Sequence, residues 1–262
     1  MSRFAENFRR LKEGNEKAFV PYIMAGDGGL ECLAERLVLL ERLGASAIEV
    51  GIPFSDPVAD GPVIQEAGLR ALANGTTLKG TIEQIAEARA SVLIPIIVMA
   101  YVNPILAYGI AEFCKDSKEA GIDGLIIPDL PLEEEGLMEP FLTDSGIELI
   151  RLVTLTTPVE RIRAISEKGN GFVYAVTVKG VTGGRGSFEE GLATFLSKVK
   201  SVSRLPVFAG FGISSAEQAH ELGSYCDGVI AGSTIVQLLH EGRLAELEEL
   251  VSCFKKEKES AL

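Results

Sequence analysis

Two acidic side chains in the segment "IEVGIPFSDPVADG", residues 48–61, are placed where they could do chemistry. Glu49 lies inside an apolar run typical of a buried strand, and Asp60 lies in the following loop, which is rich in glycine and proline. Burying a carboxylate is costly unless it is paired or protonated, and apolar surroundings raise its pKa toward neutral pH. Such a group suits general acid or base catalysis, although it could instead be a structural acid held by a tyrosine or by backbone donors. Asp60 is the weaker candidate on residue chemistry alone, because acids are common in turns.

Short apolar runs that could form strands alternate with helical periodicity along the whole chain. They are mostly continuously apolar, as in parallel strands that are covered on both faces. Eight strand–helix units predict a (β/α)8 TIM barrel, with an open doubly wound sheet as the alternative. The expected strands are 18–25, 46–50, 95–101, 123–127, 147–153, 171–176, 205–210 and 227–232.

Two helices are expected in addition to the regular units. Residues 1–14 have an amphipathic helical pattern, and "TIVQLL", residues 234–239, fits a short extra helix after the eighth strand. No linker and no shift in composition divides the chain, so we interpret residues 1–262 as a single domain. In a barrel of this kind, the functional groups come from the C-terminal ends of the strands and the loops that follow them.

Two glycine-rich turns predict a phosphate site at that end. Gly210 and Gly212 follow the seventh strand, where Ser214 is expected to open a helix, and Gly232 and Ser233 lead from the eighth strand into the short helix. Backbone N–H groups at a helix start bind phosphate, and the last two loops of a barrel are where such sites recur. The alternative is that these glycines merely end strands. A site built from amides needs no basic patch, which fits the net charge of −12.

Composition argues against several classes of function. The 25 Lys and Arg are scattered among 37 Asp and Glu, which disfavours binding to nucleic acid or to an anionic membrane. The longest apolar run, residues 91–102, is too short to span a bilayer and contains Pro95. The four cysteines form no CxxC motif, as expected of reduced thiols. We therefore expect a soluble, cytoplasmic protein.

The positions of histidine and lysine narrow the chemistry further. His220 and His240 are the only histidines, and both fall on expected helices, so neither a histidine-ligated metal nor a Ser-His-Asp triad is expected. No lysine lies in the C-terminal half of an expected strand, which disfavours a Schiff base; Lys179, the nearest, lies in a glycine-rich loop. The polar residues that remain at strand ends are Glu49, Asp60, Tyr101, Asp129 and Tyr174.

Residues 48–61 resemble the signature segment of the tryptophan synthase α chain family. Five other motifs agree in order over essentially the whole chain: "FVPYIMAGD", "MAYVNP", "GFVYAVTVKGVTG", "FAGFGIS" and "VIAGSTIV". The resemblance implies a lyase of L-tryptophan biosynthesis that cleaves indole-3-glycerol phosphate to indole and glyceraldehyde 3-phosphate by a retro-aldol reaction.

The same resemblance implies a role for each site residue. Glu49 would protonate the indole C3 and help remove the proton of the glycerol hydroxyl, while Asp60 would accept a hydrogen bond from the indole N–H. Thr182 would close a lid onto Asp60. The implied substrate contacts are Tyr22, Met99, Ile126, Phe211 and Ile230 around the indole, Tyr174 near the acids, and Gly183, Gly212, Gly232 and Ser233 at the phosphate.

The resemblance also implies a partner. A β chain carrying pyridoxal phosphate is expected, in an α2β2 tetramer, with Asp56 and Pro57 at the interface and no cofactor in this chain. Two departures from the family pattern are Val178, where many relatives have arginine, and Tyr22, where phenylalanine is common. The alternatives are another phosphate-binding barrel enzyme, or a catalytically silent subunit that only activates a β partner.

Overall fold

The strands form one parallel sheet. The structure, a computed structural model, describes residues 2–176, 185–210 and 212–255, with residues 185–190 described by their backbone alone. Within these residues, nine strands are ordered β5-β4-β3-β2-β1-β9-β8-β7-β6. Their bounds are β1 Ala18–Met24, β2 Ile48–Gly51, β3 Ile96–Met99, β4 Gly124–Ile126, β5 Glu148–Leu149, β6 Arg151–Thr154, β7 Val173–Val176, β8 Val207–Gly210 and β9 Gly228–Ala231.

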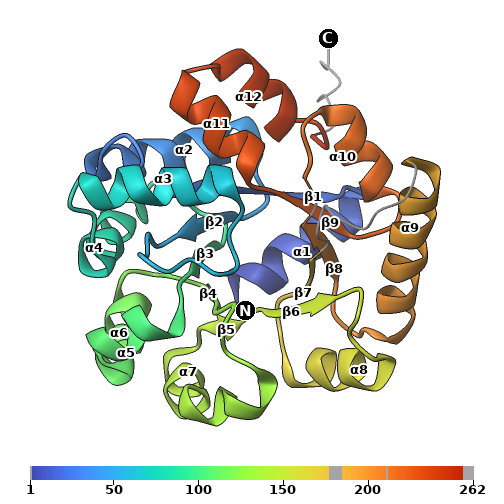
Figure 1. Cartoon of the computed structure of the whole chain (residues 1–262), viewed down its shortest axis with the longest axis horizontal. Helices are drawn as coiled ribbons and strands as arrows, with labels where there is room; N and C mark the ends of the chain where they lie inside the picture. Colours follow the sequence, from blue (N-terminus) through green and yellow to red (C-terminus); the bar gives the residue numbers. More distant parts are fainter. Residues whose placement is uncertain (1, 177–184, 211, 256–262) are drawn as a thin grey trace.

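The two ends of this strand order are joined by a single residue, which makes the sheet a barrel. β5 pairs with β4, β6 pairs with β7, and only Ile150 separates β5 from β6 along the chain. The expected fifth strand, 147–153, is therefore present as two pieces. Figure 1 shows the strands encircled by helices. The predicted (β/α)8 barrel is confirmed, and the open doubly wound sheet is wrong.

Helices connect the strands and cover the outside of the barrel. Two helices, α3 and α4, lie between β2 and β3. The helix expected after the last strand is present as α11, which extends beyond 234–239 and is followed by α12. The α-helices are α1 Arg3–Gly14, α2 Leu33–Leu43, α3 Pro62–Ala73, α4 Leu78–Ala88, α5 Val102–Tyr108, α6 Ile110–Glu119, α7 Glu139–Ser145, α8 Val159–Lys168, α9 Arg185–Val202, α10 Ala216–Gly223, α11 Ser233–Glu241 and α12 Leu244–Val251, with 3-10 turns η1 Leu30–Cys32 and η2 Leu132–Leu137.

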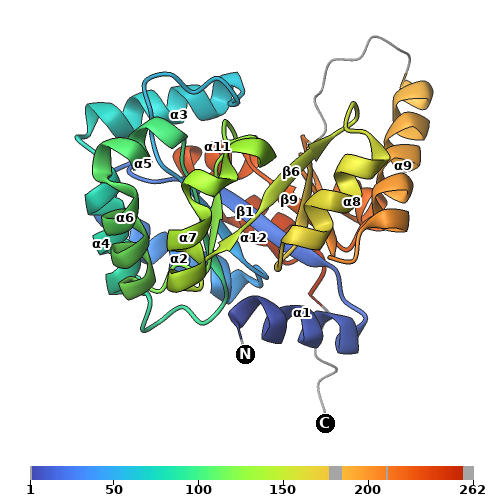
Figure 2. The same ribbon diagram turned by 90° about the horizontal axis from the view of Figure 1, so that it is seen from below.

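The N-terminal helix α1 closes one end of the barrel. Ser2 caps it by accepting a hydrogen bond from the Ala5 N–H, and Asn15 ends it in the left-handed conformation. Arg3 pairs with Asp123 just before β4, at 2.9 Å. Figure 2 shows α1 beneath the strands. Because Asp123 precedes its strand, the closed end is the N-terminal end of the barrel, and the opposite end is left for the site.

Apolar side chains from α1 and the strands fill the interior of the barrel near this closed end. Phe4 is buried among strand residues, and the rings of Phe172 and Phe208 stack at 4.3 Å. Phe8 packs edge-on against Phe208 at 5.2 Å. A second and larger apolar layer lies between the strands and the surrounding helices. Because both faces of β1 and β9 are buried, these two runs are continuously apolar.

Two observations concern membrane-spanning segments and the cysteines. No helix within residues 2–176, 185–210 and 212–255 is long and apolar enough to cross a membrane. All four cysteines, which lie in the described part of the chain, are free thiols, and Cys114 and Cys226 are buried.

Candidate active site

Glu49 lies in β2 and is buried at the end of the barrel opposite α1. Its exposed fraction is 2%, and it pairs in register with Tyr22 of β1 and Ile97 of β3. Its Oε2 atom has no hydrogen-bond partner among the described residues. Burial, followed by the negative charge of Asp60, raises the pKa of Glu49 to about 8. At neutral pH this carboxyl therefore holds a proton that it can donate.

Asp60 lies on the loop between β2 and α3 and is half-buried. Burial raises its pKa to about 6, and a hydrogen bond from Tyr101 opposes that rise. Because the charge of Asp60 acts on Glu49, the two carboxyl groups share one region of the site. At pH 7 the site thus holds one protonated and one ionised carboxyl group, as acid–base chemistry requires.

The backbone of the Asp60 loop is held from several sides. The Asp60 N–H donates to the Pro57 carbonyl at 3.1 Å, and Gln65 Nε2 of α3 donates to the Asp60 carbonyl at 2.8 Å. The Ala59 N–H donates to the Tyr101 hydroxyl at 2.9 Å. These bonds fix the Asp60 backbone relative to α3 and to the end of β3.

Two tyrosines stand beside the acids. Tyr22 is buried and Tyr174 is half-buried, and their pKa values are raised well above the usual value by burial and by the charges of Asp60 and Glu49. Both hydroxyls therefore stay neutral. A Cβ atom at Gly51 would lie 1.9 Å from the Tyr22 hydroxyl, and one at Gly210 would lie 2.6 Å from the Tyr174 hydroxyl. Both strand-end glycines are needed to make room for these rings.

Three apolar residues of the predicted indole pocket lie at the same strand ends. Met99 pairs in register with Ile126, and Ile230 pairs with Gly210. Met99 also packs against the cluster that contains Tyr22. The structure thus brings Tyr22, Tyr174, Met99, Ile126 and Ile230 to one end of the barrel. Three other predicted residues, Thr182, Gly183 and Phe211, lie outside the described residues.

The two glycine turns come together at the start of α11. Gly232 is its N-cap residue and supplies no side-chain hydrogen bond, and Ser233 is its first residue. Thr234 Oγ1 donates to the Ile213 carbonyl at 2.6 Å, which links this turn to the loop that contains exposed Gly212. A Cβ atom at Gly232 would lie 3.8 Å from the Tyr22 Cβ atom. The start of α11 therefore lies beside Tyr22, and the backbone N–H groups at a helix start can bind phosphate.

Comparison with known proteins identifies the family. A family model described as tryptophan synthase alpha chain matches residues 8–261. The chain belongs to this family. A tryptophan synthase alpha chain from Bacillus cereus is 50% identical over 255 residues, covering 97% of this chain and 99% of that relative.

Solved structures agree with this tryptophan synthase alpha chain assignment. Tryptophan synthase subunit alpha from Legionella pneumophila superimposes with a TM-score of 0.89 at 34% identity, covering 97% of each chain. A chain of the aminoacrylate-bound tryptophan synthase from M. tuberculosis superimposes with a TM-score of 0.88 at 32% identity, covering 97% of this chain and 100% of that one.

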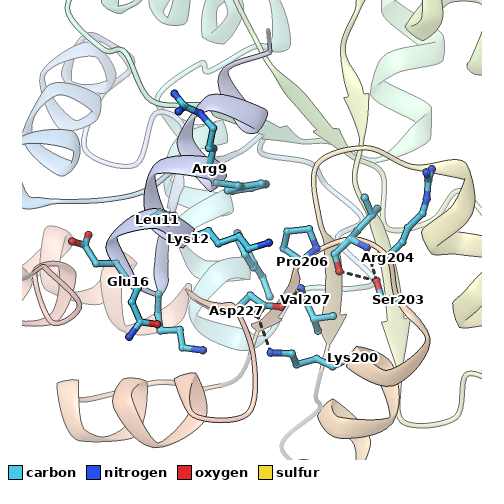
Figure 3. Close-up of a pocket in the computed structure, with 15 residues that line it drawn as sticks. Arg9, Leu11, Lys12, Glu16, Lys200, Ser203, Arg204, Pro206, Val207 and Asp227 are labelled. Atoms are coloured by element: carbon cyan, nitrogen blue, oxygen red, sulfur yellow. Dashed lines mark hydrogen bonds and ion pairs between the residues drawn. The ribbon is translucent and has the colours of Figure 1, made fainter.

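A hollow at the opposite end of the barrel is a poor candidate for the family's chemistry. It has a volume of about 610 Å³ and lies between α1 and the turn before β8 (Figure 3). Several of its cations already bind protein oxygen atoms: Lys200 pairs with Asp227 at 2.9 Å, Lys17 donates to the Cys226 carbonyl at 2.7 Å, and Arg204 donates to the Ser166 carbonyl at 2.9 Å. These contacts hold the N-terminal ends of the strands, where barrels are built for stability.

Each of the two histidines lies on a helix and has a neighbouring side chain close to its ring. His220 on α10 packs edge-on against Phe254 at 5.1 Å, and His240 on α11 has its Nδ1 atom 3.9 Å from Asp27. Among the described residues, no group of three or more His, Cys, Asp or Glu side chains is placed to hold a metal ion. The prediction that both histidines lie on helices is confirmed.

Sequence reasoning missed a buried ion pair near the site. Asp27 follows β1 and is 3% exposed, and Arg70 of α3 donates to its two carboxylate oxygens at 2.7 and 2.9 Å. Asn74 donates to the neighbouring Gly26 carbonyl at 3.0 Å. These bonds tie α3, which follows Asp60, to the loop after β1. The acid in "AGDGG" was the available signal, but its partner lies 43 residues away.

Proposed function

We propose that this chain cleaves indole-3-glycerol phosphate to indole and glyceraldehyde 3-phosphate, as the alpha subunit of a tryptophan synthase. The observation that carries the proposal is the pair of carboxyl groups at the open end of the barrel. Glu49 is buried, has an oxygen without a partner among the described residues, and holds its proton at neutral pH, while nearby Asp60 is ionised. Family membership supports this activity over that of another phosphate-binding barrel enzyme.

In the proposed reaction, Glu49 moves protons at both ends of the breaking bond. Its carboxyl group donates a proton to the indole C3. The carboxylate then takes the proton of the glycerol hydroxyl next to the breaking bond, and that carbon becomes the aldehyde of glyceraldehyde 3-phosphate. The electron pair of the broken carbon–carbon bond returns to the indole ring. Glu49 ends in its starting protonation state, so the protons balance.

Asp60 has a different task in this scheme. Protonation at C3 places positive charge on the indole ring, centred on its nitrogen. An ionised Asp60 that accepts a hydrogen bond from the indole N–H stabilises this charge more than it stabilises the neutral substrate. The pKa of about 6 keeps Asp60 ionised at pH 7 despite its partial burial.

The remaining residues of the site are assigned to the two ends of the substrate. Tyr22, Met99, Ile126, Ile230 and Tyr174 surround the indole, and the backbone amides around Gly212, Gly232 and Ser233 bind the phosphate. The bond between Thr234 and the Ile213 carbonyl supports the second assignment, because it brings the two glycine turns together. The roles of Thr182, Gly183 and Phe211 rest on the family resemblance alone.

We propose that a β chain carrying pyridoxal phosphate binds this chain in an α2β2 tetramer. Asp56 and Pro57 lie on the loop that also carries Asp60, and Val58 beside them is an apolar side chain with an exposed fraction of 83%. A partner that covers Val58 would bury this side chain. Light scattering of the mixed chains measures the stoichiometry.

The direct test is the formation of indole from indole-3-glycerol phosphate, with and without a β chain. We expect a low rate for the chain alone and clear stimulation by the partner. Stimulation should fall more than the basal rate when Asp56 or Pro57 is replaced. If this chain forms no indole in either condition, yet accelerates the reaction of the β chain with added indole, it is the catalytically silent subunit instead.

Two further properties belong to the same proposal. We infer that residues 1–262 fold as one domain, which predicts a single cooperative unfolding transition monitored by circular dichroism.

We also assign the protein to the cytoplasm, on the strength of its place in tryptophan biosynthesis. Fractionation of cells that express the chain, followed by an immunoblot, checks this location.

A further inference from the structure

Tyr101 joins the end of β3 to the loop that carries Asp60. Its side chain is buried, with an exposed fraction of 2%. Its hydroxyl accepts a hydrogen bond from the Ala59 N–H at 2.9 Å and lies close enough to the Asp60 carboxylate to lower the pKa of that group. Its ring packs against Phe54, with 5.4 Å between the ring centroids. One side chain therefore contacts both the beginning and the end of the loop between Phe54 and Asp60.

The geometry at the hydroxyl favours the ionised form of Asp60. A tyrosine hydroxyl has one proton to donate, and it can accept a bond at the same time. Because the Ala59 N–H occupies the accepting side, the hydroxyl proton is available to the Asp60 carboxylate. A hydrogen bond to a charged acceptor is stronger than one between neutral groups.

Asp129 holds Tyr101 from the other side. Tyr101 is the N-cap residue of α5, but its side chain makes no capping hydrogen bond. Instead, Asp129 in the loop after β4 accepts a hydrogen bond from the Val102 N–H through Oδ1, at 2.9 Å. This bond satisfies an orphan donor at the helix start and places a negative charge at the positive end of the helix dipole. It fixes the backbone from which the Tyr101 ring projects.

We propose that Tyr101 and Asp129 are positioning residues for the cleavage reaction: the Tyr101 hydroxyl holds Asp60 in place, and the Asp129 carboxylate holds Tyr101. The inference rests on the proposed role of Asp60. It predicts that loss of the hydroxyl changes the ionisation of Asp60 as well as its position. The charged and titratable groups that face this region are Glu49, Asp60, Asp129, Tyr22 and Tyr174.

The decisive variant is Tyr101→Phe, which keeps the ring against Phe54 and removes only the hydroxyl. Burial already raises the pKa of Asp60, and the lost bond opposed that rise, so the pKa should move further upward. The acid limb of kcat/KM, measured with the β chain present, should shift to higher pH by about one unit. At pH 6, where about half of Asp60 is ionised in the parent, this leaves kcat/KM down by about five-fold. Asp129→Ala should change the profile in the same direction but less, and Asp129→Asn, which keeps an acceptor, should restore most of the loss.

Tyr108→Phe is the matched control. The Tyr108 hydroxyl also bonds an aspartate, Asp116 of α6, at 2.5 Å, but at the far end of α5. The pH profile of kcat/KM for Tyr108→Phe should match that of the parent chain. A Tyr101→Phe profile that also matches the parent, or an equal shift in Tyr108→Phe, would overturn the inference.

A second measurement separates this inference from the proposed function. The carboxyl pKa of Asp60 can be followed by NMR in chains with 13C-labelled aspartate, without any substrate. A higher pKa in Tyr101→Phe than in the parent supports the positioning role even if the parent forms no indole, in which case only the proposed function fails. An unchanged Asp60 pKa beside an active parent would refute the positioning role and leave the proposed function standing.

Discussion

The carboxyl groups at the two ends of the barrel have different surroundings. At the closed end, Asp123 accepts hydrogen bonds from Arg3, Arg89 and the Ile96 N–H, and the rings of Phe172 and Phe208 stack. At the open end, Glu49 is buried with an oxygen that lacks a partner among the described residues. Unpaired buried carboxyl groups cost free energy, so this contrast indicates that stability is built at one end and chemistry at the other.

The largest expected effect on activity comes from Glu49→Gln, at the open end of the barrel. Glutamine keeps the size and the buried polar group but cannot donate a proton to carbon and take another from a hydroxyl. Indole formation should fall by about 10²–10⁴-fold, the usual value of general acid–base assistance. Steady-state kinetics with the β chain present measure the fall, and a variant with near-normal turnover would remove Glu49 from the mechanism.

The same variant should be more stable than the parent at alkaline pH. The folded-state pKa of Glu49, about 8, lies above its ordinary value of 4.5, so the folded chain holds a proton that the unfolded chain has released. The free energy of unfolding therefore declines as the pH rises from 4.5 to 8, and glutamine escapes this loss. At pH 9 the gain should be on the order of a few kcal/mol, since each pKa unit is worth about 1.4 kcal/mol. Urea titrations of the parent and of Glu49→Gln at pH 5 and pH 9 check this gain. If the two chains are equally stable at both pH values, Glu49 is not protonated in the fold.

Phe172→Ala tests the opposite end. Phe172 is 1% exposed and packs against Phe4, Phe8 and Phe208. Its truncation should lower the free energy of unfolding by about 3–5 kcal/mol, through lost burial and a residual cavity. The folded fraction should retain the parent's kcat at low temperature. Chemical denaturation and active-site titration measure the two quantities, and a specific loss of kcat in fully folded protein would mean that the ends are not separate.

Asp60→Asn tests the open end of the barrel through the pH dependence of the reaction rate. The parent should have a bell-shaped rate profile, because Asp60 must be ionised and Glu49 protonated, with limbs near pH 6 and pH 8. Replacing Asp60 with asparagine removes the charge that helps to raise the Glu49 pKa, so the alkaline limb should move down. We expect turnover to fall by about 10²-fold or more, as for lost stabilisation of developing charge. Asp60→Glu should retain more activity; the reverse order would contradict the charge-stabilising role.

The residues show why the sequence predicts some features and misses others. The strands were predicted because parallel strands covered on both faces are continuously apolar, and Glu49 because it interrupts such a run. The break at Ile150 was missed, because it depends on pairing with two different neighbours. Ser214 was predicted to open α10, but Ser215 is the N-cap; the adjacent serines have the same chemistry, and Ser214 bonds Gln218 instead.

Contacts between distant residues could not be predicted from spacing. The bond from Ala59 to Tyr101 spans 42 residues and depends on how the β2 loop folds over the end of β3. Tyr101 was recognised as a polar residue at a strand end, but nothing in its local sequence indicates which loop it contacts. The roles of Asp60 and of the individual phosphate-binding residues came from the family motifs, because acids and glycines in turns have many structural uses.

The smallest expected effect belongs to Arg3→Gln, at the closed end. Arg3 pairs with Asp123, but the arginine side chain is 43% exposed, and Asp123 keeps its bonds to Arg89 and to the Ile96 N–H when Arg3 is lost. Exposed ion pairs contribute about 0–1 kcal/mol, so the free energy of unfolding should fall by no more than about 1 kcal/mol, and less at high salt. The rate of indole formation and its pH profile should be those of the parent, because α1 lies across the barrel from Glu49. A change in the pH limbs of this variant would show that charge at the closed end is felt by the carboxyl pair, and the separation of the two ends would then fail for electrostatics even if it held for packing.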